Sequence, residues 1–116
     1  MEPKDFSRLA KELVGKRHEA ALRTAVSRAY YAALNHAARV AEKSGVKLPE
    51  GPRIHEVVAD SLVDIEAGLR DQLEYLKLKR GKADYRVWDP WIVDNVTDIL
   101  EVADYIIMRI DEKYGT

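Results

Sequence analysis

Cysteine is absent from this chain of 116 residues, and only four prolines and six glycines interrupt it. Without cysteine the protein has no disulfide, no thiolate nucleophile and no sulfur-ligated metal site. Nowhere do about 18 apolar residues follow one another, which excludes a transmembrane helix. The first residues are charged and contain no apolar run of the kind that signal peptides require. These absences predict a cytoplasmic protein that does not associate with a membrane.

Charge of one sign is not in excess either, because 19 basic and 20 acidic side chains leave a formal net charge of -1. Such a balance gives the whole protein no general affinity for nucleic acids or membrane surfaces. Asparagine and glutamine are scarce beside these charges, with two and one residues, a composition typical of heat-adapted proteins from thermophiles. The length suits one domain of ~100 to 150 residues, and we assign residues 1–116 to a single domain.

Apolar residues recur at helical spacing in nearly every segment between the prolines and glycines, and no segment alternates as a strand does. The spacing predicts a short helix before Gly15 and a long one over about residues 18–43, stopped at Gly45. A proline-rich loop at residues 49–52 leads into a third helix, and a fourth should end near Gly81. With a fifth helix at the C-terminus, the predicted fold is an all-α, antiparallel up-and-down bundle of four to five helices.

The C-terminal helix has the clearest start, because Asp89 can cap it and Pro90 suits its first position. Trp88 and Trp91 flank this cap and are expected to staple the helix start, with a stacking platform beside Tyr85 as the alternative. Two apolar seams then run along the helix: Ile92, Val96, Ile99, Ala103, Ile106 and Ile110 in one, and Val93, Leu100, Ile107 and Tyr114 in the other. So wide an apolar face predicts a helix packed against several neighbours or against another subunit.

Charge is segregated along the chain in spite of its overall balance. Residues 1–44 hold nine basic and five acidic side chains, residues 68–87 hold six and three, and the remaining segments are acidic. If the long second helix and the fourth helix lie side by side, their basic faces form a local cleft in which positive potential is focused. Ordinary solvated helix faces are the alternative explanation.

One polar stripe of the second helix gathers side chains that suit a nucleotide or an RNA backbone: Thr24, Arg28, Tyr31, Asn35 and Arg39. The arginines offer forks that match anions, the tyrosine offers a stacking face, and the asparagine both donates and accepts hydrogen bonds. The structural alternative places Tyr30 in the core, Tyr31 against a neighbouring helix and the arginines in ion pairs.

A second cluster follows in the fourth helix, where basic residues are interleaved with an aromatic residue and an acid: Lys77, Lys79, Arg80, Lys82, Asp84, Tyr85 and Arg86. Cations near the C-terminus of a helix interact favourably with the helix dipole even without a ligand. The dipole does not account for residues 80–85, which we predict to break the helix and to place Asp84 and Tyr85 directly after a cationic turn.

Three groups of residues together resemble the HEPN domains of prokaryotes: residues 27–33 with their two tyrosines, His55 at the start of the third helix, and Arg80 with the Ala-Asp-Tyr sequence at 83–85. The resemblance covers most of the chain in the same order. It implies an all-α bundle, commonly a homodimer, in which the second and fourth helices line a shared cleft. It also implies nucleotide binding, a role in defence, or a toxin paired with a minimal nucleotidyltransferase antitoxin.

Active members of this family resemble one another in a metal-independent ribonuclease motif, an arginine and a histidine separated by roughly four to six residues. The histidine moves the proton of a ribose hydroxyl, and the arginine stabilises charge on the phosphate. Arg80 matches the arginine, but residues 85–87 stand where the histidine should be. No other arginine precedes His18, His36 or His55 at that spacing. The sequence therefore assigns no catalytic residue.

The predicted function is that of a HEPN-like homodimeric subunit that binds a nucleotide, RNA or a partner, in a toxin-antitoxin type module with a minimal nucleotidyltransferase. The expected ligand contacts are Arg28, Tyr31, Asn35, Arg80, Asp84 and Tyr85, with His55 and Lys77 as further candidates. No cofactor is expected, and no metal, since the three histidines lie on separate segments without metal-ligand spacing. Two alternatives are a metal-independent ribonuclease with an atypical site around Arg80 and His55, and a structural dimerisation bundle.

Overall fold

The computed structural model of the protein describes residues 2–16, 18–86, 88 and 92–115. These ranges contain five α-helices and one short 3-10 turn but no β-strand, which confirms the predicted all-α bundle. The helices are α1 (Pro3–Gly15), α2 (Glu19–Lys43), α3 (Ile54–Leu62), α4 (Gly68–Tyr85) and α5 (Ile92–Tyr114), and the 3-10 turn Gly51–Arg53 precedes α3. Within the described ranges, no helix is both long and apolar enough to cross a membrane.

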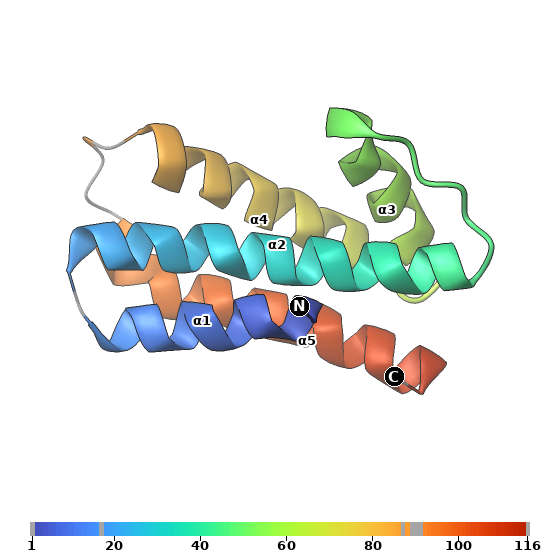
Figure 1. Cartoon of the computed structure of the whole chain (residues 1–116), viewed down its shortest axis with the longest axis horizontal. Coiled ribbons are helices and arrows are strands. Elements are labelled where there is room, and N and C mark those ends of the chain that lie inside the picture. Colours follow the sequence, from blue (N-terminus) through green and yellow to red (C-terminus); the bar gives the residue numbers. More distant parts are fainter. Residues whose placement is uncertain (1, 17, 87, 89–91, 116) are drawn as a thin grey trace.

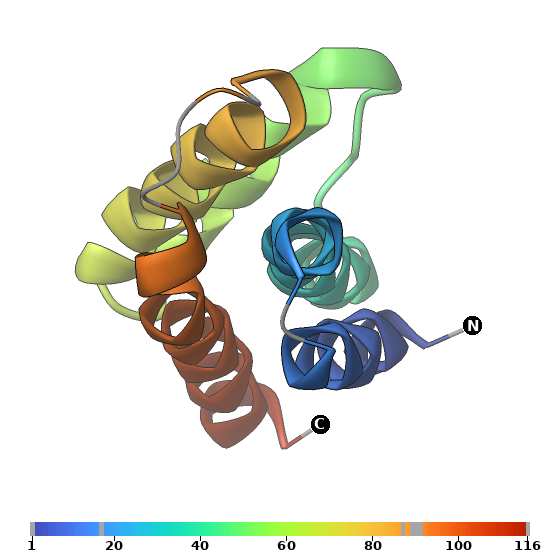
Figure 2. The ribbon, with the colours of Figure 1, turned by 90° about the vertical axis from the view of Figure 1, so that its left-hand side faces the viewer.

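The four longer helices, α1, α2, α4 and α5, run alternately in opposite directions, and α3 is inserted between α2 and α4 (Figure 1). Viewed along its long axis, the bundle has α1 and α2 on one side and α4 and α5 on the other (Figure 2). The central element is α2, because it packs against α1, α3, α4 and α5. The second and fourth helices therefore lie side by side, as the predicted cleft requires.

Alanine dominates the buried surface of α2. The most deeply buried of its small residues are at most 3 % exposed: Ala25, Ala29, Ala32, Ala33 and Ala37. Alanine has the highest helix propensity and adds little bulk, so four helices can approach the same helix closely. The apolar side predicted from the sequence is buried along its length, from Leu22 to Val40.

Local hydrogen bonds cap both ends of α2. The Nδ1 atom of His18 accepts from the backbone N–H of Ala21 at 3.2 Å and so satisfies one of the unpaired donors of the first turn. At the other end, two backbone hydrogen bonds of a Schellman motif close the helix. Gly45 has a φ of 95°, the left-handed conformation that this motif requires. The predicted stop at Gly45 is confirmed.

The fourth helix does not end at Gly81 but continues to Tyr85. The predicted break over residues 80–85 was therefore wrong. A single glycine inside a helix costs only about 1 kcal/mol relative to alanine. Burial of the Ala83 side chain, which is 2 % exposed, stabilises the helix beyond Gly81 and so opposes this cost. A second stabilising contribution comes from α2.

Arg23 of α2 caps the C-terminus of α4 from across the bundle. Its Nη1 atom donates to the carbonyls of Lys82, Ala83 and Arg86 at 3.3, 3.2 and 3.1 Å. Its Nη2 atom donates to the carboxylate of Glu19 at 3.2 Å. The last carbonyls of a helix have no partner within the helix, and a cation beside them also interacts favourably with the dipole. Because Arg23 is only 7 % exposed, water solvates its charge poorly, and these hydrogen-bond partners stabilise the charge instead.

The apolar seams of α5 are largely covered within a single chain where the structure describes their burial, and Tyr114 at the end of the second seam is the exception at 42 % exposed. In the first seam, the side chains from Val96 to Ile110 are at most 4 % exposed, and Leu100 and Ile107 of the second are 8 % exposed. This helix packs against α1, α2 and α4, so the expectation of several neighbours is confirmed. The predicted cap at Asp89 and Pro90, and Trp91 beside it, lie outside the described residues.

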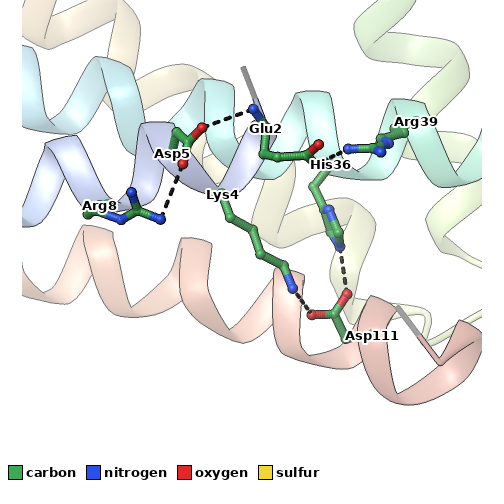
Figure 3. A network of polar contacts seen from close by, with 7 residues as sticks. All are labelled: Glu2, Lys4, Asp5, Arg8, His36, Arg39 and Asp111. Atoms are coloured by element: carbon green, nitrogen blue, oxygen red, sulfur yellow. Dashed lines mark hydrogen bonds and ion pairs between the residues drawn. The ribbon is translucent and has the colours of Figure 1, made fainter.

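A network of ion pairs fixes the start of α1 to α2 and α5 (Figure 3). Lys4 Nζ and His36 Nε2 both donate to the carboxylate of Asp111, each at 2.7 Å. Arg39 of α2 pairs with Glu2, which immediately precedes α1. Because His36 is 5 % exposed, its contact with Asp111 satisfies a buried polar group and holds α5 against α2.

Replacement of Arg23 by methionine should lower the free energy of unfolding by about 2 to 3 kcal/mol, because a buried cation and its hydrogen bonds to the end of α4 are lost. Arg70→Met is the matched control, since Arg70 is an exposed arginine that pairs with Asp60 at 3.0 Å. The control should cost less than about 1 kcal/mol. Urea unfolding measures both variants, and equal losses would contradict the capping role of Arg23.

Candidate functional site

Arg80 is the centre of the candidate site, on the side of α4 that faces α2. Its guanidinium carbon lies 5.6 and 5.7 Å from the ring centres of Tyr30 and Tyr31, and 6.0 Å from that of Tyr85. A guanidinium within about 6 Å of an aromatic ring is attracted to the face of that ring. The two tyrosines of α2 and the arginine of α4, which carry much of the family resemblance, thus meet in the structure.

Tyr30, His55 and Glu74 form a hydrogen-bonded chain that joins α2, α3 and α4 next to Arg80. The hydroxyl of Tyr30 lies 2.8 Å from Nδ1 of His55, and Nε2 of His55 lies 2.8 Å from a carboxylate oxygen of Glu74. A carboxylate only accepts, so Nε2 of a neutral ring carries the hydrogen and Nδ1 accepts from the tyrosine hydroxyl. His55 is 2 % exposed, and both of its ring nitrogens are occupied by these partners.

The protonation states of the site follow from burial and from its neighbours. Burial raises the pKa of Tyr30 to about 12, although the nearby cation of Arg80 acts in the opposite direction. Tyr30 therefore keeps its proton at neutral pH and donates to His55. Desolvation lowers the pKa of Arg80, but Tyr31 and Asp84 act the other way, and the pKa is raised overall. Arg80 is therefore cationic.

Asp84 lies one helical turn after Arg80, and Nη1 of Arg80 is 3.4 Å from its Oδ2. A well-formed charge-assisted hydrogen bond measures about 2.7 to 2.9 Å, so this contact is loose. The Nε atom of Arg80 is buried and has no acceptor among the described residues. The guanidinium thus retains hydrogen-bonding capacity that the chain itself does not use.

A shallow groove of about 520 Å³ runs along α4 beside Arg80 and is lined mainly by cations. Its lining consists of Glu74, Lys77, Leu78, Arg80, Gly81, Lys82 and Arg86. The acid in this set, Glu74, is held by His55. The predicted candidate Lys77 therefore shares one surface with Arg80, and the local potential of the groove is positive.

Large aromatic side chains stand out at the same end of α4. Tyr85 is 71 % exposed and Trp88 is 70 % exposed. The guanidinium of Arg86 lies over the ring of Trp88, 5.8 Å from its centre. Exposed aromatic rings and cations therefore share one surface, which we call the α4 end surface and define as Lys77, Leu78, Arg80, Lys82, Tyr85, Arg86 and Trp88.

The stripe predicted on α2 is divided between two neighbouring helices. Tyr31 meets Arg80 of α4, whereas the guanidinium of Arg28 lies 5.8 Å from the ring of Phe6 in α1. Asn35 is half-buried one turn beyond Tyr31. The site around Arg80 thus contains Tyr31, while Arg28 is turned toward α1, and a shared ligand contact of Arg28 and Arg80 is not supported.

Sequence reasoning missed two members of the site. Tyr30 was expected only to fill the core, and Glu74 was not singled out. The link from Tyr30 to His55 spans 25 positions and depends on how α3 packs, so no local pattern reveals it. The one available signal was a tyrosine hydroxyl among the alanines of a buried helix face, because such a group needs a polar partner.

A larger hollow, of about 690 Å³, lies between α1 and α5. Charged groups around it are paired with each other: Lys4 contacts Asp111 at 2.7 Å, and Lys11 contacts Asp104 at 3.0 Å. Ser7 also donates to Asp104, at 3.0 Å. This hollow is therefore a charge-neutralised seam between two helices, and the α4 end surface is the better candidate for binding a ligand.

No protein-family model, curated protein or solved structure matches this chain. Over the part of the chain that the structure describes, no three histidine, aspartate or glutamate side chains gather as a metal site would require. The function is therefore inferred from the geometry of the site together with the resemblance in the sequence.

Replacement of Tyr30 by phenylalanine should lower the free energy of unfolding by about 1 to 3 kcal/mol, because Nδ1 of the buried His55 loses its donor. Tyr31→Phe is the matched control, since it removes a neighbouring hydroxyl that is not part of the hydrogen-bonded chain. The control should change stability by less than about 0.5 kcal/mol. Urea unfolding at neutral pH compares the two variants, and equal effects would contradict the role of the Tyr30 hydroxyl.

The same variant should alter the response to alkali. Tyr30 has a pKa of about 12 in the folded protein against 10.0 for an ordinary tyrosine. Its stabilising contribution is complete below the unfolded pKa and is lost as the pH rises toward the folded one, because the unfolded chain then releases its proton more readily. The stability difference between the wild type and Tyr30→Phe should therefore shrink over this interval. Urea titrations at a series of alkaline pH values measure it, and a constant difference would refute the assignment.

Proposed function

We propose that this protein is a HEPN-like subunit that binds the phosphate of a nucleotide or of an RNA strand at the α4 end surface. Arg80 is the proposed phosphate contact, and Lys77, Lys82 and Arg86 extend the positive surface along the groove. A bundle in which α2 packs against α4 agrees with what the resemblance to HEPN domains implies.

One observation carries the proposal. The arginines of the α4 end surface lie over aromatic rings, with Arg80 over three tyrosines and Arg86 over Trp88. Six cations elsewhere on the bundle lie instead against carboxylates at 3.2 Å or less: Lys4, Arg8, Lys11, Arg39, Arg70 and Arg109. Arg28 is an exception, because its guanidinium lies over the ring of Phe6. A ring attracts a cation without using its hydrogen-bond donors, whereas a carboxylate occupies them. Arg80 and Arg86 are thus arranged to receive an anion.

The helix dipole alone is an incomplete explanation of this surface. It stabilises a cation near the C-terminus of a helix by about 0.3 to 1 kcal/mol, which accounts for the presence of the basic residues. It does not account for Tyr85 and Trp88, whose rings are more than two-thirds exposed. Bases of a single strand stack on such rings, a contact of about 1 to 3 kcal/mol per base. Phosphate binding and base stacking together explain both kinds of residue.

Binding is proposed without cleavage. A general base must lie within about 2.6 to 3.2 Å of the group whose proton it takes. His55 is the histidine that belongs to the site, but it is buried and both ring nitrogens already hold Tyr30 and Glu74. A ribose hydroxyl would have to displace one of these buried partners. The alternative ribonuclease function therefore finds no support in this arrangement.

The proposal also covers the oligomeric state, the location and the partner of this subunit. Following the resemblance, it acts as a cytoplasmic homodimer together with a minimal nucleotidyltransferase partner. The apolar seams of α5 do not argue for the dimer, since their side chains between Val96 and Ile110 are buried within one chain. A purely structural bundle is the opposing hypothesis. A measurement of saturable binding of a phosphate ligand would reject it.

Replacement of Arg80 by alanine should weaken the binding of a fluorescent single-stranded RNA at least about tenfold, because hydrogen bonds between charged groups contribute about 1.5 to 3 kcal/mol. Arg70→Ala is the matched control, since it removes an exposed arginine from the opposite end of the same helix. Fluorescence anisotropy at low salt measures the affinity, because phosphate contacts weaken steeply as salt rises.

Loss of Arg80 also removes packing against three tyrosines, so a second variant keeps the test independent of folding. Lys77→Gln combined with Lys82→Gln should weaken binding about tenfold while thermal unfolding stays that of the wild type. Unchanged binding in both folded variants would refute the proposed site. The RNA should remain intact in the presence of EDTA, and cleavage that disappears in Arg80→Ala and in His55→Ala would favour the ribonuclease instead.

A further inference from the structure

We propose that Asp84 is a built-in competitor for Arg80, whose carboxylate occupies the phosphate position in the unliganded protein and so sets the affinity of the site for anions. This inference rests on the proposed function, because it assumes that an anion binds at Arg80. It assigns Asp84 an opposing role, in contrast to the supporting ligand contact that the sequence predicted.

The energetics of the helix do not explain an acid at this position. Asp84 lies in the last turn of α4, one residue before the helix ends at Tyr85. The partial negative charge of the terminal carbonyls disfavours a carboxylate there. The order of the pair is also the less favourable one, because an acid four residues before a basic residue stabilises a helix more than the reverse order does. A stabilising role would be better served by a neutral or basic side chain.

The contact between Arg80 and Asp84 is loose enough to be exchanged. At 3.4 Å it is longer than the 3.0 Å contact that Arg70, near the start of α4, makes with Asp60 of α3. Both side chains of the Arg80 pair are partly exposed, and pairs of this kind contribute only about 0 to 1 kcal/mol. A phosphate carries more charge and more acceptor oxygens than a carboxylate, so it can replace Asp84 at the guanidinium.

Nothing else in the described structure anchors the Asp84 carboxylate, for which Arg80 is the one hydrogen-bond partner that the described residues provide. Glu74, the other acid near the groove, differs in this respect because it is tied to His55 at 2.8 Å. Asp84 can therefore turn away when a ligand arrives, whereas Glu74 stays in place. The buried Nε of Arg80, without an acceptor among those residues, shows that the carboxylate does not saturate the guanidinium.

The expected consequence is a threshold for binding. Two unit charges about 4 Å apart repel by about 1 kcal/mol in water, which corresponds to roughly fivefold in affinity. Asp84 therefore disfavours anions that offer a single weak contact, relative to those with two or more oxygens for the guanidinium. Phosphate groups meet this requirement and chloride does not.

Isothermal titration calorimetry with inorganic pyrophosphate at low salt tests the inference on Asp84→Asn. The variant keeps the shape of the side chain and should bind pyrophosphate roughly fivefold more tightly than the wild type. Asp60→Asn is the matched control, because it also removes an acid from an arginine pair and changes the net charge equally; its affinity should stay that of the wild type. The gain from Asp84→Asn should disappear when Arg80 is replaced by alanine in the same chain.

The outcomes separate this inference from the proposed function. If the wild type binds pyrophosphate through Arg80 but Asp84→Asn binds equally or more weakly, the competitor role is overturned and the binding site stands. Absence of binding in the wild type and in every variant overturns both. Binding by Asp84→Asn alone supports a site that Asp84 holds closed. Thermal unfolding of Asp84→Asn should occur at or above the wild-type temperature, and a clear decrease would assign Asp84 a structural role instead.

Discussion

The burial of α2 on nearly every side is the constraint on which the rest of the structure depends. A helix with four neighbours must be narrow, and its alanines meet that need. Each polar side chain that it buries must also find a partner, because an unsatisfied buried group costs about 1 to 3 kcal/mol. Arg23 finds the end of α4, Tyr30 finds His55 of α3, and His36 finds Asp111 of α5. These three buried polar residues of α2 thus each specify the place of a different helix.

This arrangement determines how firmly the candidate site is built. Because Arg23 satisfies the terminal carbonyls of α4, the last turn of that helix is ordered as helix, and Asp84 and Tyr85 project from a rigid element. Tyr30 reaches His55 with its hydroxyl and Arg80 with its ring, so one side chain serves the core and the site together. Sites carried by helices hold their geometry more closely than sites carried by loops. The positions of the α4 cations are therefore consequences of packing around α2.

Features that are determined by residues close together in the sequence could be predicted, whereas features that are determined by distant residues could not. The helices, their buried faces and the stop at Gly45 follow from patterns within a few residues, and they were predicted. The end of α4 was not, because the arginine that caps it lies some sixty positions earlier. The direction of Arg28 depends on which side of α2 receives α1, and no helical wheel contains that information. For the same reason the sequence indicated Arg80 as a site residue but not the hydrogen-bonded chain beside it, which runs from Tyr30 through His55 to Glu74.

The near-zero net charge shows why a sum over the chain is a poor guide to what α4 can bind. On α1 and α5, basic and acidic side chains neutralise each other across the helix contact, as Lys4 and Asp111 do. At the end of α4, the dipole and aromatic rings support the cations, so their charge does not require a carboxylate partner. Charges farther apart than about 10 Å are largely screened at ordinary ionic strength. A ligand that approaches α4 therefore meets the potential of that helix end, and the acids of distant helices, which make the total negative, have little influence on it.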